Sequence, residues 1–204
     1  MEIKTIGVIG AGERGWRIAC AALLGGFRTI LEDVSSDVLE QGTSHITREL
    51  DGRVARGRLT LEQKDAAIAR LSTANRADEV CREADMLIET VPEEMEVKLE
   101  IFTIFDKFAK PDAILASHTE LSITEIAAIT FRTENCVGMR FVDRAPEKTL
   151  LEIVRGADTS EATVATCVRV GRQMGMETLV IRDDTDPIAD DSETARFRVK
   201  GVPE

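Results

Sequence analysis

The sequence of 204 residues has few histidines and cysteines, and it has no long hydrophobic run. Its two histidines, His45 and His118, are too few and too far apart for a metal site of the usual kind. Its four cysteines are widely spaced without a CxxC pair, so we expect reduced core residues rather than ligands or disulfides. No apolar stretch approaches the ~20 residues of a membrane-spanning helix, and we therefore predict no membrane segment.

Positive charge is also scarce, because 26 Lys and Arg residues face 37 Asp and Glu residues and leave a net charge of −11. This balance argues against nucleic acid as a main partner, and it requires local positive groups wherever an anionic ligand binds. The first apolar run begins close to Met1 and leaves no room for a signal peptide, so we expect a cytoplasmic protein.

What the sequence does contain is a glycine motif near its start, in the stretch Ile6 to Ala19. A short β-branched run meets Gly10, Gly12 and Gly15 in the pattern G-x-G-x-x-G, and helix-forming residues follow. Gly10 would permit the turn, Gly12 would let a phosphate approach the backbone, and Gly15 would let the helix pack on the strand. We predict that the N-terminus of this helix binds the diphosphate of a dinucleotide.

A second apolar run, Arg28 to Leu31, follows that helix and ends in Glu32 and Asp33. Asp33 stands where a dinucleotide fold places the carboxylate that holds the adenosine ribose, and this carboxylate would repel a 2′-phosphate. The sequence therefore favours NAD over NADP. Glu13 adds an unfavourable negative charge to the loop, which Arg14 and Arg17 can offset.

Strand-like and helix-like stretches alternate along the chain to residue 181, which predicts an α/β fold with a doubly wound, mostly parallel sheet. The predicted strands after the second are 71–74, 86–91, 113–116, 136–141, 150–154 and 177–181. The predicted helices after the first are 35–56, 60–71, 78–82, 92–108, 122–129 and 160–174.

The domain prediction is one dinucleotide-binding domain over residues 1–182, followed by an acidic tail or edge extension over residues 183–204. Within the domain, residues 35–71 form a helical pair inserted after the second strand, either for ligand binding or as a larger scaffold. Arg53, Arg56 and Arg58 make a basic cluster on this pair, which is either a phosphate site or a solvated helix end.

Local signals predict how several helices begin. Capping boxes are expected at Thr60 with Gln63 and at Ser122 with Glu125, and Pro92 is expected to open a helix that has Glu93 in its first turn. That helix carries apolar residues at helical spacing, which predicts a core stripe. The stripe consists of Val97, Ile101, Ile104, Phe105 and Phe108.

Several motifs in fixed order resemble one known family over about residues 3–183. They are GVIGAGxxG, LEDVS, ARGxLTxEQ, IETVPEExExK, ILAS-T-LSITEIA, GMxF and LEIVRG. Together they resemble the NAD-binding domain of the L-3-hydroxyacyl-CoA dehydrogenases. The resemblance implies a Rossmann-type fold, a role in fatty acid metabolism, and oxidation of the 3-hydroxyl of an acyl-CoA by hydride transfer to NAD.

The resemblance also implies a set of cofactor-binding residues. They are Gly10, Gly12, Glu13, Arg14 and Gly15 of the loop, together with Asp33, Val91, Glu93, Lys98 and Thr119. In the family a separate helical C-terminal domain contributes substrate contacts and the dimer interface, and these 204 residues contain no counterpart of it. Self-association, or a separate partner that supplies the helical domain, follows as the expected alternative.

The catalytic positions depart from the family. Arg140 occupies the place of the histidine that acts as general acid and base, and Asp143 occupies the place of an asparagine. Glu152 is retained from the glutamate that orients the histidine, and Thr119 is a candidate for the family's serine hydroxyl. A guanidinium cannot accept a proton, so we predict a charge-assisted pair between Arg140 and Glu152 rather than a base. His118, at the end of a predicted strand, is the candidate stand-in base.

Two classes of function remain open from the sequence. The first is an oxidoreductase that acts on acyl-CoA substrates, weakened or inactivated because Arg140 replaces the catalytic histidine. The second is a catalytically silent NAD(H)-binding protein for regulation or sensing, and a weaker third reading is a scaffold without a nucleotide site.

Overall fold

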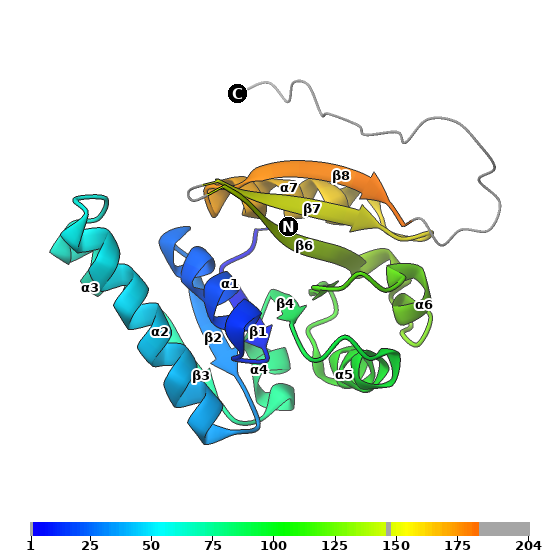
Figure 1. Cartoon of the computed structure of the whole chain (residues 1–204). Helices are drawn as coiled ribbons and strands as arrows, with labels where there is room; N and C mark the ends of the chain where they lie inside the picture. The colour runs from blue at the N-terminus through cyan, green and yellow to red at the C-terminus, as the bar shows by residue number, and fades with distance from the viewer. Residues whose placement is uncertain (1, 146–147, 184–204) are drawn as a thin grey trace.

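The computed structural model describes residues 2–145 and 148–183, with the backbone alone described at 143–145 and 148–149. Its strands form one eight-stranded sheet in the order β3-β2-β1-β4-β5-β6-β7-β8 (Figure 1). The strands are β1 (Thr5–Ile9), β2 (Arg28–Glu32), β3 (Leu71–Ala74), β4 (Met86–Glu89), β5 (Ile114–Ser117), β6 (Cys136–Ala145), β7 (Lys148–Arg155) and β8 (Glu177–Arg182). The helices are α1 (Glu13–Leu24), α2 (Ser36–Ala55), α3 (Leu61–Ile68), α4 (Ala77–Glu83), α5 (Met95–Phe108), α6 (Ile123–Ala127) and α7 (Glu161–Gln173), with a 3₁₀ turn at Thr133–Asn135.

The predicted doubly wound, mostly parallel sheet is confirmed. Neighbouring strands in the described chain run parallel except β6 and β7, which are antiparallel. Only residues 146–147 separate these two strands, and so short a connection cannot hold the crossover that a parallel pair needs. Order reverses beside β1, where β2 lies on one side and β4 on the other, which is the position where ligands bind in such sheets.

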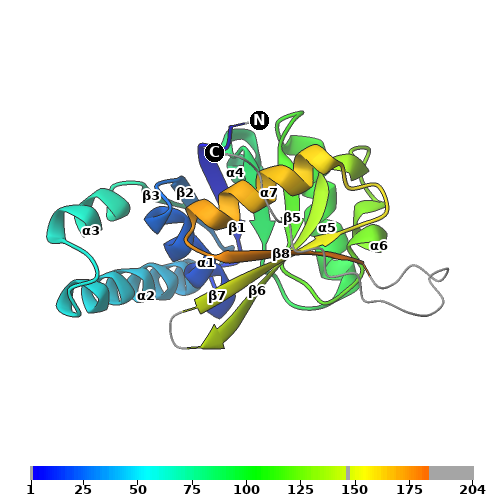
Figure 2. The same ribbon diagram turned by 90° about the horizontal axis from the view of Figure 1, so that it is seen from above.

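Helices cover both faces of the sheet (Figures 1 and 2). On one face α1 and α7 bury Leu23 and Cys167 in a core that also includes Leu39 of α2. On the other face α4, α5 and α6 bury a second core around Phe102 and Phe105. All four cysteines are buried and unpaired, as the sequence predicted.

The helical pair after β2 is confirmed as α2 and α3, which project from one end of the molecule (Figures 1 and 2). The Ser35 hydroxyl accepts a hydrogen bond from the backbone of Val38 and caps α2. The capping box at Thr60 and Gln63 forms in full at the start of α3. The pair packs on α1, where the Trp16 ring stacks on the His45 ring with 5.3 Å between centroids.

The prediction for the start of α5 is wrong by three residues. The helix begins at Met95 instead of Pro92, with Glu94 as its N-cap residue. Glu93 lies before the helix because its carboxylate accepts hydrogen bonds from the loop after β5, including the Thr119 hydroxyl at 2.6 Å. A tertiary contact therefore overrides the local helix signal.

The predicted core stripe of α5 is confirmed in part: Phe105 is fully buried, and Ile101, Ile104 and Phe108 are partly buried against the same core, whereas Val97 is not part of it. The helix turns Lys98, Phe102 and Phe105 toward the core. The other four members of the stripe line an open pocket, which is described below.

The N-terminus of α6 is capped differently from the prediction. The Ser122 hydroxyl accepts from the Glu125 backbone at 3.2 Å, so half of the expected capping box forms. The second acceptor is Asp183, whose Oδ2 receives the Ser122 hydroxyl and the Thr124 backbone N–H, each at 2.8 Å. Asp183 was expected to begin the acidic tail, but its side chain is buried and ties the end of β8 to α6.

Replacement of Asp183 by alanine should destabilise the domain, because two donors at the start of α6 lose their shared acceptor. The expected loss in the free energy of unfolding is about 1–2 kcal/mol, measured by urea denaturation. Asp158→Ala is the matched control because Asp158 is exposed. Equal stability of the two variants would show that the Asp183 carboxylate does not stabilise α6.

Candidate functional site

The glycine loop between β1 and α1 has the geometry that the sequence predicted. Gly10 has a φ of 94°, a conformation that side chains with a Cβ rarely adopt. A Cβ on Gly15 would lie 1.7 Å from the Gly10 carbonyl oxygen, so only glycine allows α1 to start this close to β1. A Cβ on Gly12 would meet no heavy atom within 4 Å, which leaves open space in front of the helix N-terminus.

The charges in the loop are partly balanced within α1. The Glu13 carboxylate accepts from the Arg17 guanidinium at 3.0 Å, as the sequence suggested. Glu13 is therefore partly neutralised where a diphosphate would approach.

Asp33 lies directly after β2 and holds the loop in place. Its Oδ2 accepts the backbone N–H of Ala11 at 2.9 Å, and its Oδ1 accepts that of Ser35 at 3.0 Å. The carboxylate faces a pocket of about 1010 Å³, which Gly10, Gly12 and Val91 also line. An ionised carboxylate accepts several hydrogen bonds, so Asp33 retains acceptor capacity for ribose hydroxyls.

The far wall of this pocket comes from α5. Val97, Ile101, Ile104 and Phe108 line it, and the last three also pack against the core around Phe102 and Phe105. An apolar wall opposite a carboxylate suits a nucleoside, because the base needs apolar contact and the sugar needs acceptors.

Glu32, next to Asp33, is a buried carboxyl that the sequence analysis did not single out. It also lines the pocket. Burial and the neighbouring Asp33 charge raise the pKa of Glu32 from 4.5 to about 7. At neutral pH Glu32 therefore carries, on average, less than a full negative charge.

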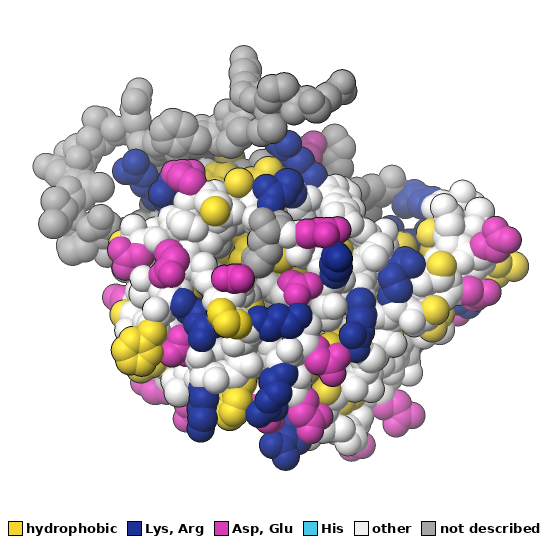
Figure 3. All heavy atoms as spheres, turned by 180° about the vertical axis from the view of Figure 1, so that it is seen from behind, with side chains coloured by type: hydrophobic (Ala, Val, Ile, Leu, Met, Phe, Trp, Pro, Cys, Tyr) yellow, Lys and Arg dark blue, Asp and Glu magenta, His cyan; other side chains and the backbone are white. Residues whose placement is uncertain are grey.

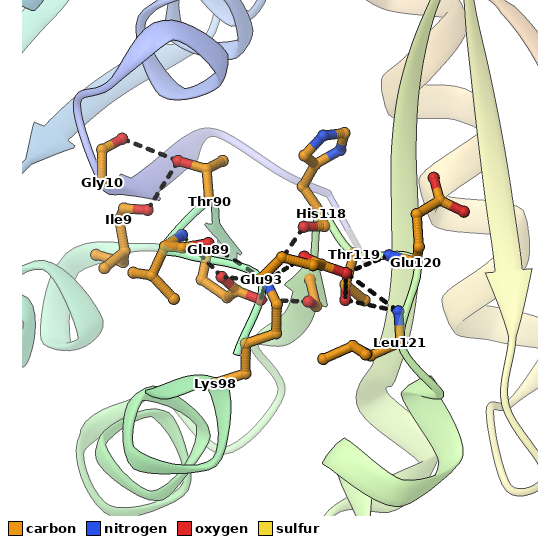
Figure 4. A network of polar contacts seen from close by, with 12 residues as sticks. Ile9, Gly10, Glu89, Thr90, Glu93, Lys98, His118, Thr119, Glu120 and Leu121 are labelled. Atoms are coloured by element: carbon orange, nitrogen blue, oxygen red, sulfur yellow. Dashed lines mark hydrogen bonds and ion pairs between the residues drawn. The ribbon is translucent and has the colours of Figure 1, made fainter. Parts of the chain in front are cut away.

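The other end of the site is a network of buried charges around Lys98, shown in Figure 4. The Lys98 ammonium, which has no exposed surface, donates to both carboxylate oxygens of Glu89 at 3.0 and 3.2 Å. Glu89 also accepts from the Ser117 hydroxyl and from the Val91 backbone. Burial raises the pKa of Glu89, against the opposing effect of the Lys98 ammonium. Sequence analysis missed Glu89 and Ser117, although both stand at strand ends beside the switch in strand order.

Lys98 connects this buried pair to the loops above the strand ends. Its ammonium lies 3.2 Å from Glu93 Oε2 and donates to the His118 carbonyl at 3.3 Å. Glu93 in turn accepts from the Thr119 hydroxyl and from the backbone of Glu120, each at 2.6 Å (Figure 4). Burial acts to raise the pKa of Glu93, but these hydrogen bonds and the Lys98 charge outweigh it and lower that pKa.

The network is joined to the glycine loop. The Thr90 hydroxyl, just after β4, donates to the carbonyl oxygens of Ile9 and Gly10 at 3.1 and 3.0 Å (Figure 4). The predicted cofactor residues Gly10, Val91, Lys98 and Thr119 thus lie along one edge of the sheet.

His118 is held at the end of β5 by its ring nitrogen Nδ1. The Phe141 backbone N–H donates to Nδ1 at 3.3 Å, and the Met139 carbonyl oxygen lies 3.2 Å from the same atom. Burial lowers the pKa of His118, and the charges of Arg14 and Lys98 add to this effect. The lowered pKa favours the neutral imidazole, which is the form that a general base needs.

Arg140 does not make the predicted ion pair with Glu152. The two residues are directly opposite each other in the β6–β7 pair. The Arg140 Nε instead donates to the Thr119 carbonyl at 2.8 Å, and Nη1 lies 3.3 Å from Glu120 Oε2. Since β6 continues past the end of β5, the Arg140 side chain reaches the loop after β5. Asp143, predicted to replace an asparagine, has no described side chain.

Two arginines of the basic cluster on the helical pair form ion pairs with a glutamate of α2. Arg53 and Arg56 share the carboxylate of Glu49, at 2.8 and 3.8 Å. Elsewhere the two signs of charge are interspersed, as the face seen in Figure 3 shows. Within the described residues, no cluster of three or more His, Cys, Asp or Glu side chains could hold a metal ion. No helix in this part of the chain is both long enough and apolar enough to cross a membrane.

Replacement of Glu32 by glutamine should change how stability depends on pH. The folded-state pKa of about 7 exceeds the ordinary 4.5, so the folded chain binds the proton more tightly and loses stability as pH rises between these values. The free energy of unfolding of the wild type should therefore be lower than that of Glu32→Gln by about 1–3 kcal/mol at pH 8, and the difference should be smaller at pH 5. Urea denaturation at both pH values measures this, with exposed Glu62→Gln as control; parallel pH curves for wild type and Glu32→Gln would contradict the assignment.

Comparison with known proteins supports the same reading. The family model described as "3-hydroxyacyl-CoA dehydrogenase, NAD binding domain" matches residues 5–185. A 3-hydroxybutyryl-CoA dehydrogenase of Bradyrhizobium diazoefficiens is 38% identical over 182 residues, which cover 89% of this chain and 62% of the relative. A probable 3-hydroxybutyryl-CoA dehydrogenase of Bacillus subtilis is 36% identical over 184 residues, which cover 90% and 64%.

Among solved structures, the (S)-3-hydroxybutyryl-CoA dehydrogenase of Ralstonia eutropha superposes with a TM-score of 0.85 at 30% identity, over 89% of this chain and 64% of that one. The chain thus spans less than two thirds of the length of these relatives. NAD, the predicted cofactor, is the cofactor that the family's description names. From residue 5 to residue 185 the chain belongs to the family of 3-hydroxyacyl-CoA dehydrogenase NAD-binding domains.

Proposed function

We propose that this domain binds NAD(H) and transfers hydride between it and a 3-hydroxy or 3-oxo substrate, far more slowly than a chain with a histidine at position 140. The observation that carries the proposal is the contrast between the two ends of the site. The nucleotide end has an open Gly12, an Asp33 carboxylate and an apolar wall. The substrate end has Arg140 where the resemblance places the histidine.

The chemistry of Arg140 explains the expected low rate. NAD, when bound, accepts or supplies the hydride, and the protein must move a proton at the substrate oxygen. A guanidinium remains protonated at any ordinary pH, so Arg140 can stabilise a developing oxyanion but cannot remove a proton. Loss of a positioned acid and base reduces the rate by about 10²–10⁴. His118, whose Nδ1 lies against the Met139 carbonyl and whose Nε2 remains for a substrate, is the residue that we assign to slow proton transfer.

A second candidate function is NAD(H) binding without chemistry, for sensing or regulation. It is favoured by the contacts of Arg140. The guanidinium binds the Thr119 carbonyl and the Glu120 carboxylate, so these contacts within the protein already occupy part of it. For the first candidate, the resemblance suggests acyl-CoA as the substrate. It also suggests that a separate helical partner or a second copy of the chain completes the site.

Binding of NADH should quench Trp16 fluorescence, because Trp16 directly follows Gly15 and its ring lies beside His45 and Arg17. Gly12→Val should abolish the quenching without unfolding the domain, since its side chain would occupy the open space in front of α1. Ala55→Val, an equivalent change at an exposed position, is the control. Full NADH binding by Gly12→Val would contradict this location of the diphosphate.

Arg140→His should increase the rate of NADH oxidation by acetoacetyl-CoA, because it introduces a group that can donate and accept a proton beside Glu152. We expect a gain of roughly 10²-fold if the substrate pocket is intact. The rate is followed at the NADH absorbance, with Arg28→His, at the amino-terminal end of β2, as control. Strong NADH binding without any gain in rate would favour the silent binding protein.

A further inference from the structure

Arg140 is an unusual residue for the substrate end of this site, because its charge is mostly buried and only weakly compensated. Its side chain is 16% exposed, and its ion-pair partner Glu120 is 77% exposed. An ion pair with so exposed a carboxylate is weak and is readily exchanged for another anion.

The contacts of the guanidinium leave part of it open. Its Nε is used by the Thr119 carbonyl, and Nη1 faces Glu120. A guanidinium carries five N–H donors in a fixed fork, a geometry that matches a carboxylate. The bond to the Thr119 carbonyl fixes the direction of the fork and so prepares it for a planar anion.

A purely structural role for Arg140 would predict a different partner. Glu152 lies directly opposite on β7, on the same face of the strand pair. Among the described residues the side chain instead extends to the loop after β5. Thr119 in this loop bonds Glu93, which pairs with Lys98 beside the cofactor edge.

We propose that Arg140 anchors the carboxylate of a small 3-oxo or 3-hydroxy acid, and that this carboxylate displaces Glu120 when it binds. The inference rests on the proposed function and changes its substrate class: a free acid takes the place of the acyl-CoA thioester that the resemblance suggests. His118 follows β5, the strand beside β6, and its Nδ1 contacts the β6 backbone on both sides of Arg140, at the Met139 carbonyl and the Phe141 N–H.

The test uses acetoacetate and its neutral analogue acetoacetamide, titrated by calorimetry into protein saturated with NAD⁺. Acetoacetate should bind and acetoacetamide should not, because the amide lacks the charge that replaces Glu120. Arg140→Gln should weaken acetoacetate binding by about tenfold or more, the loss of one charge-assisted pair. Glu120→Gln should strengthen it, since the competing carboxylate is gone.

Arg28→Gln and Glu83→Gln are the matched controls, because these residues form an ion pair at the amino-terminal end of β2 and should not affect acetoacetate binding. The increase in Glu120→Gln is the decisive result, since loss of a purely structural contact would not improve binding. Equal affinity for acid and amide, or unchanged binding in Arg140→Gln, would overturn the proposal. Failure of the proposed function itself is seen separately and first, as absence of Trp16 quenching by NADH.

Discussion

The buried ion pair between Lys98 and Glu89 is the interaction on which the candidate site depends. It joins the ends of β4 and β5 to α5, and neither side chain has exposed surface. Two charges in an apolar interior are tolerable only when each has further partners, and here Ser117, Val91 and the His118 carbonyl provide them. Removal of one partner from such a pair typically costs about 3–5 kcal/mol, because the other charge is left buried and unpaired.

This pair also determines the positions of residues that reach the surface of the site. Lys98 holds Glu93, and Glu93 holds the loop from Thr119 to Leu121 through hydrogen bonds of 2.6 to 3.2 Å. The same loop supplies the carbonyl that receives Arg140. A charge placed in the core therefore sets the geometry of the substrate end, while Asp33 performs the equivalent role at the nucleotide end by holding the glycine loop.

The two ends of the site have different chemistry. The nucleotide end combines an open helix N-terminus with acceptors for a ribose, which is enough to bind a dinucleotide. The substrate end replaces a titratable imidazole with a permanent cation. A guanidinium at this strand position cannot move a proton as an imidazole can, and it offers fixed N–H donors in its place.

The sequence by itself determined the features that depend on local pattern. The glycine motif, the alternation of strands and helices, the α2–α3 pair and the position of Asp33 were all predictable, because each follows from residues close together in the chain. The inability of Arg140 to act as a base was also predictable, since it is a property of the side chain alone. The tertiary structure decided which groups meet.

Glu93 lies before α5, and not in its first turn as predicted, because its carboxylate accepts hydrogen bonds from three donors in the loop after β5. Most of the apolar stripe of α5 lines a pocket. Arg140 forms its ion pair with Glu120 instead of Glu152. These outcomes depend on strand register and on contacts between segments far apart in sequence, which no local pattern specifies.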